Sequence, residues 1–403
     1  MNEIADRYDI IIVGGRVAGA AAAIGLARHD YRILLLERAG MPSDTLSTHF
    51  LWPDGTAALK RLGVLDQVLA DDLPKIHYFQ SWDEEDRLVA DLVEIDGVNF
   101  GICPRRTVLD GALFKHASES PNVDAVDHAR VVSLVNDGEG VSGVILEHDG
   151  GERQVAARLV VGADGRNSLV ARETGAEQRD LMPAGRYWYY GYFEGATPPE
   201  PAESFIISSA ERDFVRSART NDGLQMVLYG AYTDDFDEFR QDHERLFLER
   251  VKAHPAAQIL LGDAKLASQV SGIAGIDGYY RQAHGPGWAL IGDAVHQKDP
   301  IAGRGVNEAL RGAEWLADAL SDGISSDALD AYGERLREIT WPKYQLTHIV
   351  ARPDLYRTDE QGELMEQRIV TQGGLTEFMR LWYDDRATFD AYFAEAGTEL
   401  ANG

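Results

Sequence analysis

The chain has 403 residues, of which 44% are hydrophobic and 26% are charged, and its formal net charge is −27. This length suffices for two or three lobes around a large core, and no stretch reaches the roughly 18 to 20 uninterrupted apolar residues that a membrane span needs. The negative charge disfavours nucleic acid and membrane surfaces as partners, and the one cysteine, Cys103, has no second cysteine for an intrachain disulfide.

The N-terminal stretch MNEIADRYDI contains neither the basic segment nor the apolar segment of an export signal. The histidines are scattered, without the H-x-x-x-H or H-E-x-x-H spacing of common metal sites. We therefore expect a cytoplasmic protein, a monomer or a homodimer, without a metal ion.

Residues 8–38, YDIIIVGGRVAGAAAAIGLARHDYRILLLER, predict a βαβ unit. An apolar strand runs into Gly14, a helix of small residues follows over 18–29, and a second apolar strand covers 31–37. Apolar runs that barely alternate are typical of parallel strands covered on both faces, with the helix as the crossover between them.

The turn after the first strand partly matches the G-x-G-x-x-G pattern of phosphate-binding turns. Gly14 and Gly19 occupy the first and third positions, but Arg16 stands at the second, where a glycine lets a pyrophosphate approach the backbone. The arginine either blocks that approach or adds its charge to a phosphate, and both alternatives stay open at this point. Glu37, at the end of the second strand, stands where an acidic residue accepts hydrogen bonds from a ribose.

Two later segments, 158–175 and 287–320, repeat the order of strand, glycine turn and helix start, with Asp164 and Asp293 at their turns. Between them, 181–280 shows the aromatic alternation of antiparallel strands, and 324–403 carries aromatic stripes at helical spacing. We therefore predict an α/β fold, in which a Rossmann-like domain with βαβ units carries an inserted antiparallel-sheet domain and C-terminal helices. The predicted boundaries are 1–74, 101–180 and 281–323 for the Rossmann-like domain, 75–100 and 181–280 for the inserted substrate-binding domain, and 324–403 for the helical region.

With these three motifs in this order, the chain resembles the flavin-dependent monooxygenases of the para-hydroxybenzoate hydroxylase type, the group A aromatic hydroxylases, over most of 8–330. The resemblance implies an FAD cofactor, NADPH or NADH as a transient reductant, and O2. It also implies that an FAD C4a-hydroperoxide passes its hydroxyl group to an aromatic or polycyclic small molecule. SGIAGIDG (271–278) follows no apolar strand, so a separate nicotinamide domain is not expected.

The resemblance also implies roles for individual residues. The glycines of the first turn would hold the FAD pyrophosphate at a helix N-terminus, Glu37 would bind the adenosine ribose, and Asp293 would bind the flavin-side ribose. Asp164 would serve both FAD and the pyridine nucleotide, and the turn from Pro300 to Val306 would lie against the isoalloxazine. For each position, the alternative is a turn or cap residue without a ligand. The full set of expected cofactor residues is Gly14, Gly15, Arg16, Gly19, Glu37, Arg38, Arg106 (with Arg105 as its rival), Asp164, Gly292, Asp293, Pro300, Gly303, Gly305 and Val306.

Candidate substrate contacts lie in the inserted domain, where aromatic residues cluster in sequence. Of these we single out Tyr190, Tyr192, Met226 and Tyr229, although strand alternation allows only about half of such a set to face one side. His49, in DTLSTHFLWPDG, is the candidate catalytic base, since a neutral imidazole accepts a proton near pH 7. The alternative is a structural histidine, and His296 has at most a supporting role.

Other flavin chemistries on the same fold stay open. A halogenase would need a lysine for the hypohalous species, for which Lys75 is a candidate, but the W-x-W-x-I-P signature is missing. A geranylgeranyl-reductase-like enzyme and a flavin-binding protein without turnover are further alternatives. The substrate, the regiochemistry, the choice between NADH and NADPH, and the choice among hydroxylation, epoxidation and Baeyer–Villiger insertion are not predicted.

Overall fold

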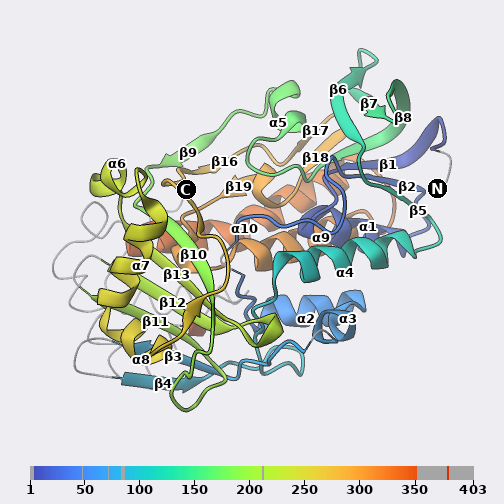
Figure 1. The fold of residues 1–403 in the computed structure, drawn as a ribbon. Coiled ribbons are helices and arrows are strands. Elements are labelled where there is room, and N and C mark those ends of the chain that lie inside the picture. The colour runs from blue at the N-terminus through green and yellow to red at the C-terminus, as the bar shows by residue number, and fades with distance from the viewer. Residues whose placement is uncertain are drawn as a thin grey trace.

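The computed structural model describes residues 4–47, 49–70, 72–82, 87–210, 213–351 and 379–380. Their arrangement confirms the predicted α/β class, with mixed sheets and helices packed around them (Figure 1). The helices are α1 (Val17–Ala27), α2 (Pro53–Leu62), α3 (Leu65–Leu69), α4 (Arg106–Ser118), α5 (Leu169–Glu173), α6 (Phe236–Phe239), α7 (His243–Ala253), α8 (Pro255–Leu261), α9 (Gly305–Ala319) and α10 (Ser326–Ala351). Short 3-10 turns are η1 (Asn221–Gly223), η2 (Thr233–Asp235), η3 (Gly292–Ala294) and η4 (Pro300–Ala302).

The first sheet has a parallel centre, in which β1 pairs with β2 on one side and with β8 on the other. Its strand order is β17-β18-β8-β1-β2-β5, and β6 and β7 extend it as an antiparallel flap on β8. The carboxyl ends of the parallel strands therefore meet at one edge, where open α/β sheets bind their ligands. The strands are β1 (Arg7–Val13), β2 (Ile33–Leu36), β5 (Val123–Val126), β6 (Arg130–Asn136), β7 (Val141–His148), β8 (Gly151–Gly162), β17 (His284–Gly285) and β18 (Trp288–Leu290).

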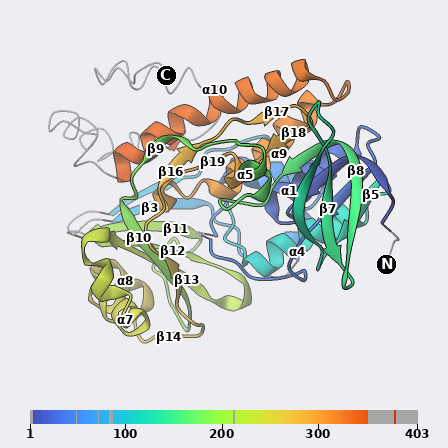
Figure 2. The same cartoon turned by 90° about the horizontal axis from the view of Figure 1, so that it is seen from above.

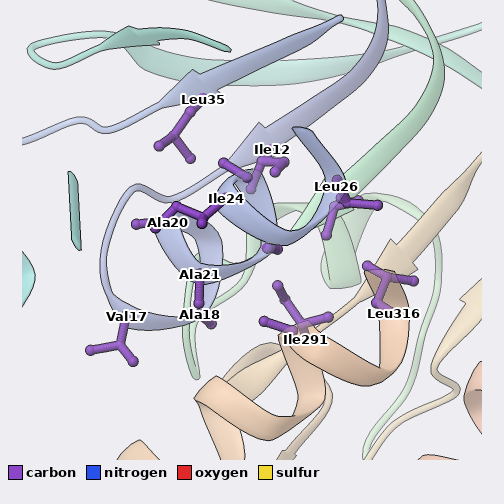
Figure 3. Close-up of a cluster of buried hydrophobic side chains, with 14 of the residues drawn as sticks. Ile12, Val17, Ala18, Ala20, Ala21, Ile24, Leu26, Leu35, Ile291 and Leu316 are labelled. Carbon is purple, nitrogen blue, oxygen red and sulfur yellow. The ribbon is translucent and has the colours of Figure 1, made fainter. Parts of the chain in front are cut away.

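Helix α1 is buried between this sheet and α9, which explains its run of small residues. In Figure 3, the labelled residues of α1 lie between the strand residues Ile12 and Leu35 on one side and Ile291 and the α9 residue Leu316 on the other. Small side chains let the helix backbone approach both neighbours, and the apolar strands supply the buried area that stabilises the contact. The predicted βαβ unit is thus the centre of the larger hydrophobic core.

The second sheet packs its inner face toward the first sheet and its outer face against α6, α7 and α8 (Figures 1 and 2). Its order is β14-β10-β13-β12-β11-β3-β4, with β15 also on β10, and all pairs are antiparallel except β3 with β11. The strands are β3 (Tyr78–Trp82), β4 (Arg87–Asp91), β10 (Arg186–Glu194), β11 (Ser204–Ala210), β12 (Asp213–Arg219), β13 (Gln225–Tyr232), β14 (Lys265–Leu266) and β15 (Ser271–Ile273).

Helix α10 runs along one side of the molecule, from β9 and β16 to β17 (Figure 2). It covers a small third sheet made of β9 (Arg179–Met182), β16 (Gly278–Tyr280) and β19 (His296–Gln297). The other predicted C-terminal helical stretch, LTEFMRLWYDDRATFDAYFAEAG, lies almost entirely outside the described residues. Within the described ranges, no helix is both long enough and apolar enough to cross a membrane.

Candidate functional site

A cavity of about 650 Å³ opens at the carboxyl edge of the first sheet, between that sheet and the second one. It reaches the N-termini of α1 and α9 and the strand ends of β2 and β8. Most of the predicted cofactor residues therefore meet in one place, although they come from distant parts of the sequence. Those that line the cavity are Gly14, Arg16, Glu37, Arg38, Arg106, Asp164, Gly292, Asp293, Pro300, Gly303, Gly305 and Val306.

The β1–α1 turn brings the strand and the helix into close contact. Gly14 has φ +103°, and a Cβ on Gly19 would lie 1.8 Å from the Gly14 carbonyl oxygen, so a side chain fits at neither position. Gly14 lines the cavity together with the first helical residues Val17 and Ala18, whereas Gly15 and Gly19 lie behind it. The turn thus presents the positive end of the α1 dipole to the cavity.

Arg16, at the second glycine position, directs its guanidinium toward α4 and the loop after β2. Nη1 donates to Asp110 Oδ2 at 3.0 Å, and Nη2 donates to Ser43 Oγ at 2.9 Å. The fully buried Asp110 also accepts hydrogen bonds from Arg106 Nε at 2.9 Å and Nη2 at 2.8 Å. One carboxylate therefore holds both arginines, and the Arg16 guanidinium is anchored to residues outside the turn.

Glu37 is held at the end of β2 by two backbone groups. Its Oε2 accepts from the Gly15 N–H and its Oε1 from the Ala39 N–H, both at 2.9 Å. Each carboxylate oxygen can accept a further hydrogen bond, which suits a ligand with hydroxyl groups. The carboxylate thus lies at the cavity wall with its orientation fixed.

Asp164 lines the cavity and also holds the start of α5, whose N-cap residue is Ser168. Its Oδ1 accepts from Ser168 Oγ at 2.5 Å, and its Oδ2 accepts from the Leu169 N–H at 2.6 Å. Burial raises the pKa of Asp164, although these bonds favour its charged form. Desolvation within the cavity likewise raises the pKa of Asp293, whose side chain is open to the cavity at η3 near the cations Arg106 and Lys298.

A buried group of three charged or titratable side chains closes the cavity beside α9. Glu308 Oε2 lies 2.8 Å from His296 Nε2 and forms an ion pair with Lys298 Nζ. Burial alone would raise the pKa of Glu308, but the neighbouring Lys298 and His296 hold it below its usual range. Lys298 and Glu308 were not predicted from the sequence. The signal that could have identified Lys298 was a charged residue within an otherwise apolar, glycine-rich segment.

The cavity wall opposite the glycine turn belongs to the second sheet. Trp188, Tyr190 and Leu228 line the cavity, and Tyr190 pairs directly with Leu228 across β10 and β13. Tyr192 and Met226 face the same side, but they lie in the core behind the wall. Of the four predicted substrate contacts, Tyr190 therefore reaches the cavity, and the other three do not.

The prediction that Tyr229 contacts the substrate needs correction, because Tyr229 lies on the outer face of the second sheet. It stacks on Phe239, and its hydroxyl donates to Asp213 at 2.8 Å. Met226 and Tyr229 are three positions apart on one strand, so the two-residue period places them on opposite faces.

His49 requires a second correction, since it does not line the cavity. Its ring lies edge-on to Tyr190 with centroids 4.8 Å apart, and its Nε2 is hydrogen-bonded to the Tyr192 hydroxyl at 2.7 Å. Burial, together with Arg106 and Arg105, lowers its pKa to about 3. The fully buried imidazole thus lies behind Tyr190 and outside the cavity lining, in a position that supports the wall.

A family model described as an FAD binding domain matches residues 7–347. The chain belongs to this family. The predicted FAD cofactor and the FAD-dependent oxidoreductase class are thereby confirmed.

Proteins similar to this chain carry the names of different reactions. Digeranylgeranylglycerophospholipid reductase of Methanosarcina acetivorans is 25% identical and covers 88% of this chain and 86% of its own. The 3-demethoxyubiquinol 3-hydroxylase of Escherichia coli is 27% identical and covers 83% of this chain and 82% of its own. The solved structure of the flavin-dependent brominase Bmp2 has a TM-score of 0.81 at 17% identity, covering 97% of this chain and 99% of that chain.

The residues around the cavity fit FAD, as expected for the FAD binding domain. The N-termini of α1 and α9 reach the cavity, and Gly305 leaves open space where a side chain would project. Both helix N-termini favour negative charge. The N-terminus of α1 would face the FAD pyrophosphate, and the N-terminus of α9 would face the isoalloxazine ring. Four exposed arginines also line the opening: Arg38, Arg130, Arg166 and Arg172. Of these, the sequence had pointed only to Arg38, without a specific role.

Proposed function

We propose that the chain is an NADPH- or NADH-dependent FAD monooxygenase of the para-hydroxybenzoate hydroxylase type, which uses O2 to hydroxylate an aromatic or polycyclic small molecule. One observation carries the proposal: the cofactor residues and an aromatic wall share a single cavity. Trp188 and Tyr190 line it together with Pro300, at the turn expected to lie against the flavin ring. FAD, when bound, supplies the redox chemistry and the activation of oxygen.

The chain's own side chains position a flat substrate and keep water away from it. The Trp188 indole N–H donates to Asp299 Oδ1 at 3.2 Å, which fixes the ring orientation. Leu228, Ile273 and Ile276 add apolar surface to the same wall. An aromatic ring packed there gains offset or edge contacts with Trp188 and Tyr190, in addition to the burial of its apolar area.

His49 and Tyr192 support this wall from behind. Their hydrogen bond at 2.7 Å and the edge contact of His49 with Tyr190 limit the movement of the Tyr190 ring. With a pKa near 3, the imidazole is neutral at physiological pH and can accept a hydrogen bond without adding charge. We therefore assign His49 a positioning role in the proposed reaction.

Halogenation and isoprenoid reduction are the competing candidates. The lysine considered from sequence for a halogenase, Lys75, lies over the Phe100 ring and does not line the cavity. The lysine that does line it, Lys298, is ion-paired with Glu308. The aromatic wall favours a planar aromatic substrate over a flexible isoprenoid chain.

The test supplies the FAD-loaded protein with NADPH or NADH, isotopically labelled O2 and a panel of phenols and polycyclic aromatics. We expect one aromatic class to accelerate nucleotide oxidation and to yield a product with one labelled oxygen atom. A halogenated product in a parallel assay with halide, or reduction of isoprenoid double bonds without O2, would instead identify one of the two competing reactions.

Matched variants on β10 connect the reaction to the wall. Tyr190→Ala removes a side chain of the cavity wall, whereas Tyr189→Ala removes the adjacent ring, which faces Phe239 on the other side of the sheet. We expect Tyr190→Ala to uncouple nucleotide oxidation from product formation with unchanged FAD content, and Tyr189→Ala to retain coupling. Equal coupling in both variants would contradict the assigned position of the substrate.

A further inference from the structure

Asp299 stands where the aromatic wall of the cavity meets the turn that begins at Pro300. Its Oδ1 accepts hydrogen bonds from the Trp188 indole N–H at 3.2 Å and from the Ile301 N–H at 2.9 Å. These two bonds fix the orientation of the carboxylate, which caps the short turn η4. Asp299 lines the cavity, so a ligand group held by this carboxylate would lie beside both the wall and the turn.

The second carboxylate oxygen of Asp299 is not used by the fold. Oδ2 is buried and accepts no hydrogen bond from the described residues, and Asp299 is only 1% exposed. Leaving a buried acceptor without a partner destabilises a protein, so the stability of the fold does not explain this oxygen. The oxygen therefore indicates a hydrogen-bond donor that a ligand supplies.

The charges around Asp299 favour its role as an acceptor. Burial raises its pKa, whereas hydrogen bonds from a backbone N–H and an indole favour its charged form, as do the cations Arg186 and Arg216. Neither cation donates a hydrogen bond to Oδ2. The two cations thus offset the buried negative charge and leave this oxygen available.

Gln297 provides a second acceptor on the same short segment. Its Oε1 is buried and has no hydrogen-bond partner in the part of the chain that the structure describes, and the residue lines the cavity while being 8% exposed. His296 and Lys298 both contact Glu308, and alternate side chains of an extended segment share one side. Gln297 and Asp299 therefore lie together on the other side of this segment.

We propose that Asp299 and Gln297 form an acceptor pair, which binds the hydroxyl or amino group of the aromatic substrate while the substrate ring packs on Trp188. This inference rests on the proposed function, because it assigns the ligand group of the same cavity. Both side-chain oxygens accept hydrogen bonds from O–H and N–H groups, and a carboxylate repels anions. The acceptor pair thus selects neutral ring compounds that carry a donor, such as phenols and anilines.

The test titrates the FAD-loaded protein with small probes and follows the absorbance of the bound flavin. Phenol and aniline carry a donor, anisole and N,N-dimethylaniline are their methylated counterparts without one, and benzoate is an anion. We expect phenol or aniline to bind about tenfold more tightly than its methylated counterpart, because hydrogen bonds to charged groups are the strong ones. Benzoate should bind more weakly than phenol.

An isosteric substitution tests the carboxylate. Asp299→Asn keeps an oxygen for the Trp188 and Ile301 donors, while the unpartnered oxygen becomes an amide NH2 group. The preference for the donor probe over its methylated counterpart should therefore fall to about one or reverse. Asp277→Asn is the matched control and should preserve the preference, since Asp277 is exposed and does not line the cavity.

The second member of the acceptor pair is tested by Gln297→Leu. This variant should lose only part of the preference, because the Asp299 carboxylate remains. FAD content and thermal unfolding report whether each variant is folded. Asp299→Asn should retain FAD, since it keeps the two hydrogen bonds that hold the carboxylate position against the wall and the turn.

The proposal is overturned by any of four results. These are no spectral shift with phenol or aniline, equal binding of each donor probe and its methylated counterpart, an unchanged preference in Asp299→Asn, or benzoate binding as tight as that of phenol. The titration measures binding alone. A selective donor site without any hydroxylated product would therefore reject the proposed hydroxylation and leave the acceptor pair intact.

Discussion

Arg16 connects three parts of the molecule at a position where a glycine is more usual. Its guanidinium contacts Ser43 in the loop after β2 and Asp110 on α4, while its backbone belongs to the β1–α1 turn. The side chain thus stabilises the walls of the cavity, and the turn itself remains lined by Gly14 and the start of α1. Because Asp110 and Ser43 hold the guanidinium, this geometry favours neither of the two alternatives left by the sequence, blockage of the turn or a contact with a phosphate.

Replacing Arg16 separates a structural role from contact with the cofactor. Arg16→Gly removes charge-assisted hydrogen bonds to partly buried groups, so we expect a loss of about 1–2 kcal/mol in the free energy of unfolding. The dissociation constant of FAD should change by less than about threefold. Urea unfolding and flavin fluorescence measure the two quantities. A large loss of FAD affinity at unchanged stability would show instead that Arg16 binds the cofactor.

His49 makes the stability of the fold depend on pH in a defined direction. Its pKa is about 3 in the folded protein, against 6.5 for an ordinary histidine. Between these values the unfolded chain binds one more proton than the folded protein, so the free energy of unfolding falls as the pH decreases through this range.

The prediction is measured as a difference between two proteins. Between about pH 7.5 and about pH 5.5, wild type should lose about 1.4 kcal/mol more than His49→Asn. Asparagine is chosen because His49 has φ +61°, a conformation that asparagine tolerates. Urea unfolding of both proteins at the two pH values provides the comparison, and identical losses would refute the assignment.

Glu308 compensates the buried charge of Lys298. Glu308→Gln leaves the ammonium group without its carboxylate, so we expect a loss of about 3–5 kcal/mol in the free energy of unfolding. The double variant Lys298→Met with Glu308→Gln should recover most of that loss, because it also removes the unpaired charge. A double-mutant cycle by urea unfolding tests the coupling. Additive effects would mean that the ion pair contributes little.

At the scale of elements, the contact between α1 and the strand end requires a glycine. A Cβ on Gly19 would lie 1.8 Å from the backbone oxygen of Gly14, and neither backbone segment can move without displacing buried neighbours. In α9, by contrast, a Cβ on Gly312 would have no heavy atom of another segment within 4 Å.

These two helix positions form a matched pair. Gly19→Ala should destabilise the protein by more than about 3 kcal/mol and release FAD, since overpacking at backbone atoms is costly. Gly312→Ala should stabilise it by about 0.5–1 kcal/mol, since alanine is the better helix former. Thermal unfolding and flavin content measure both effects. Equal behaviour of the two variants would contradict the role assigned to the close contact.

The first sheet was predictable from sequence, whereas several contacts of the cavity were not. Uninterrupted apolar runs mark strands buried on both faces, and the glycine turns mark their ends. In contrast, Arg16 meets Asp110 and Lys298 meets Glu308 only because α4 and α9 pack where they do. Sequence gives no register between such elements, so these partners came from the structure.

Strand faces were predictable only in relative terms. The two-residue period correctly places Tyr190 and Tyr192 on one face, and it separates Met226 from Tyr229. It does not say which face meets the cofactor, because both faces of the second sheet carry buried aromatic residues. The outer face is covered by α6 to α8, whose packing decided the outcome for Tyr229.

On the scale of the whole molecule, a strongly acidic protein surrounds a cavity with basic residues at its opening. The net charge is −27, yet Arg38, Arg130, Arg166 and Arg172 line the cavity together with Lys298. Local cations offset the overall negative potential where an anionic cofactor enters. The cavity also touches both large sheets, so a bound ligand contacts both.

FAD binding should therefore stabilise both sheets. At about 100 times its dissociation constant, FAD should raise the free energy of unfolding by about 2.7 kcal/mol. Hydrogen exchange followed by mass spectrometry should show slower exchange in β1 and also in β13, whose Leu228 lines the cavity. Protection confined to β1 and its neighbours would mean that the second sheet opens independently.

The scattered origin of the cavity residues also has a consequence for biosynthesis. Strand β1 needs β8 as its neighbour, and the α9 side of the cofactor site is completed only by residues 303–309. A ribosome adds roughly 5–20 residues per second, so the glycine turn leaves the exit tunnel long before α9 does. The nascent chain therefore cannot complete the cofactor site before α9 has emerged, and its apolar strand β1 lacks its neighbour β8 until residues 151–162 have emerged.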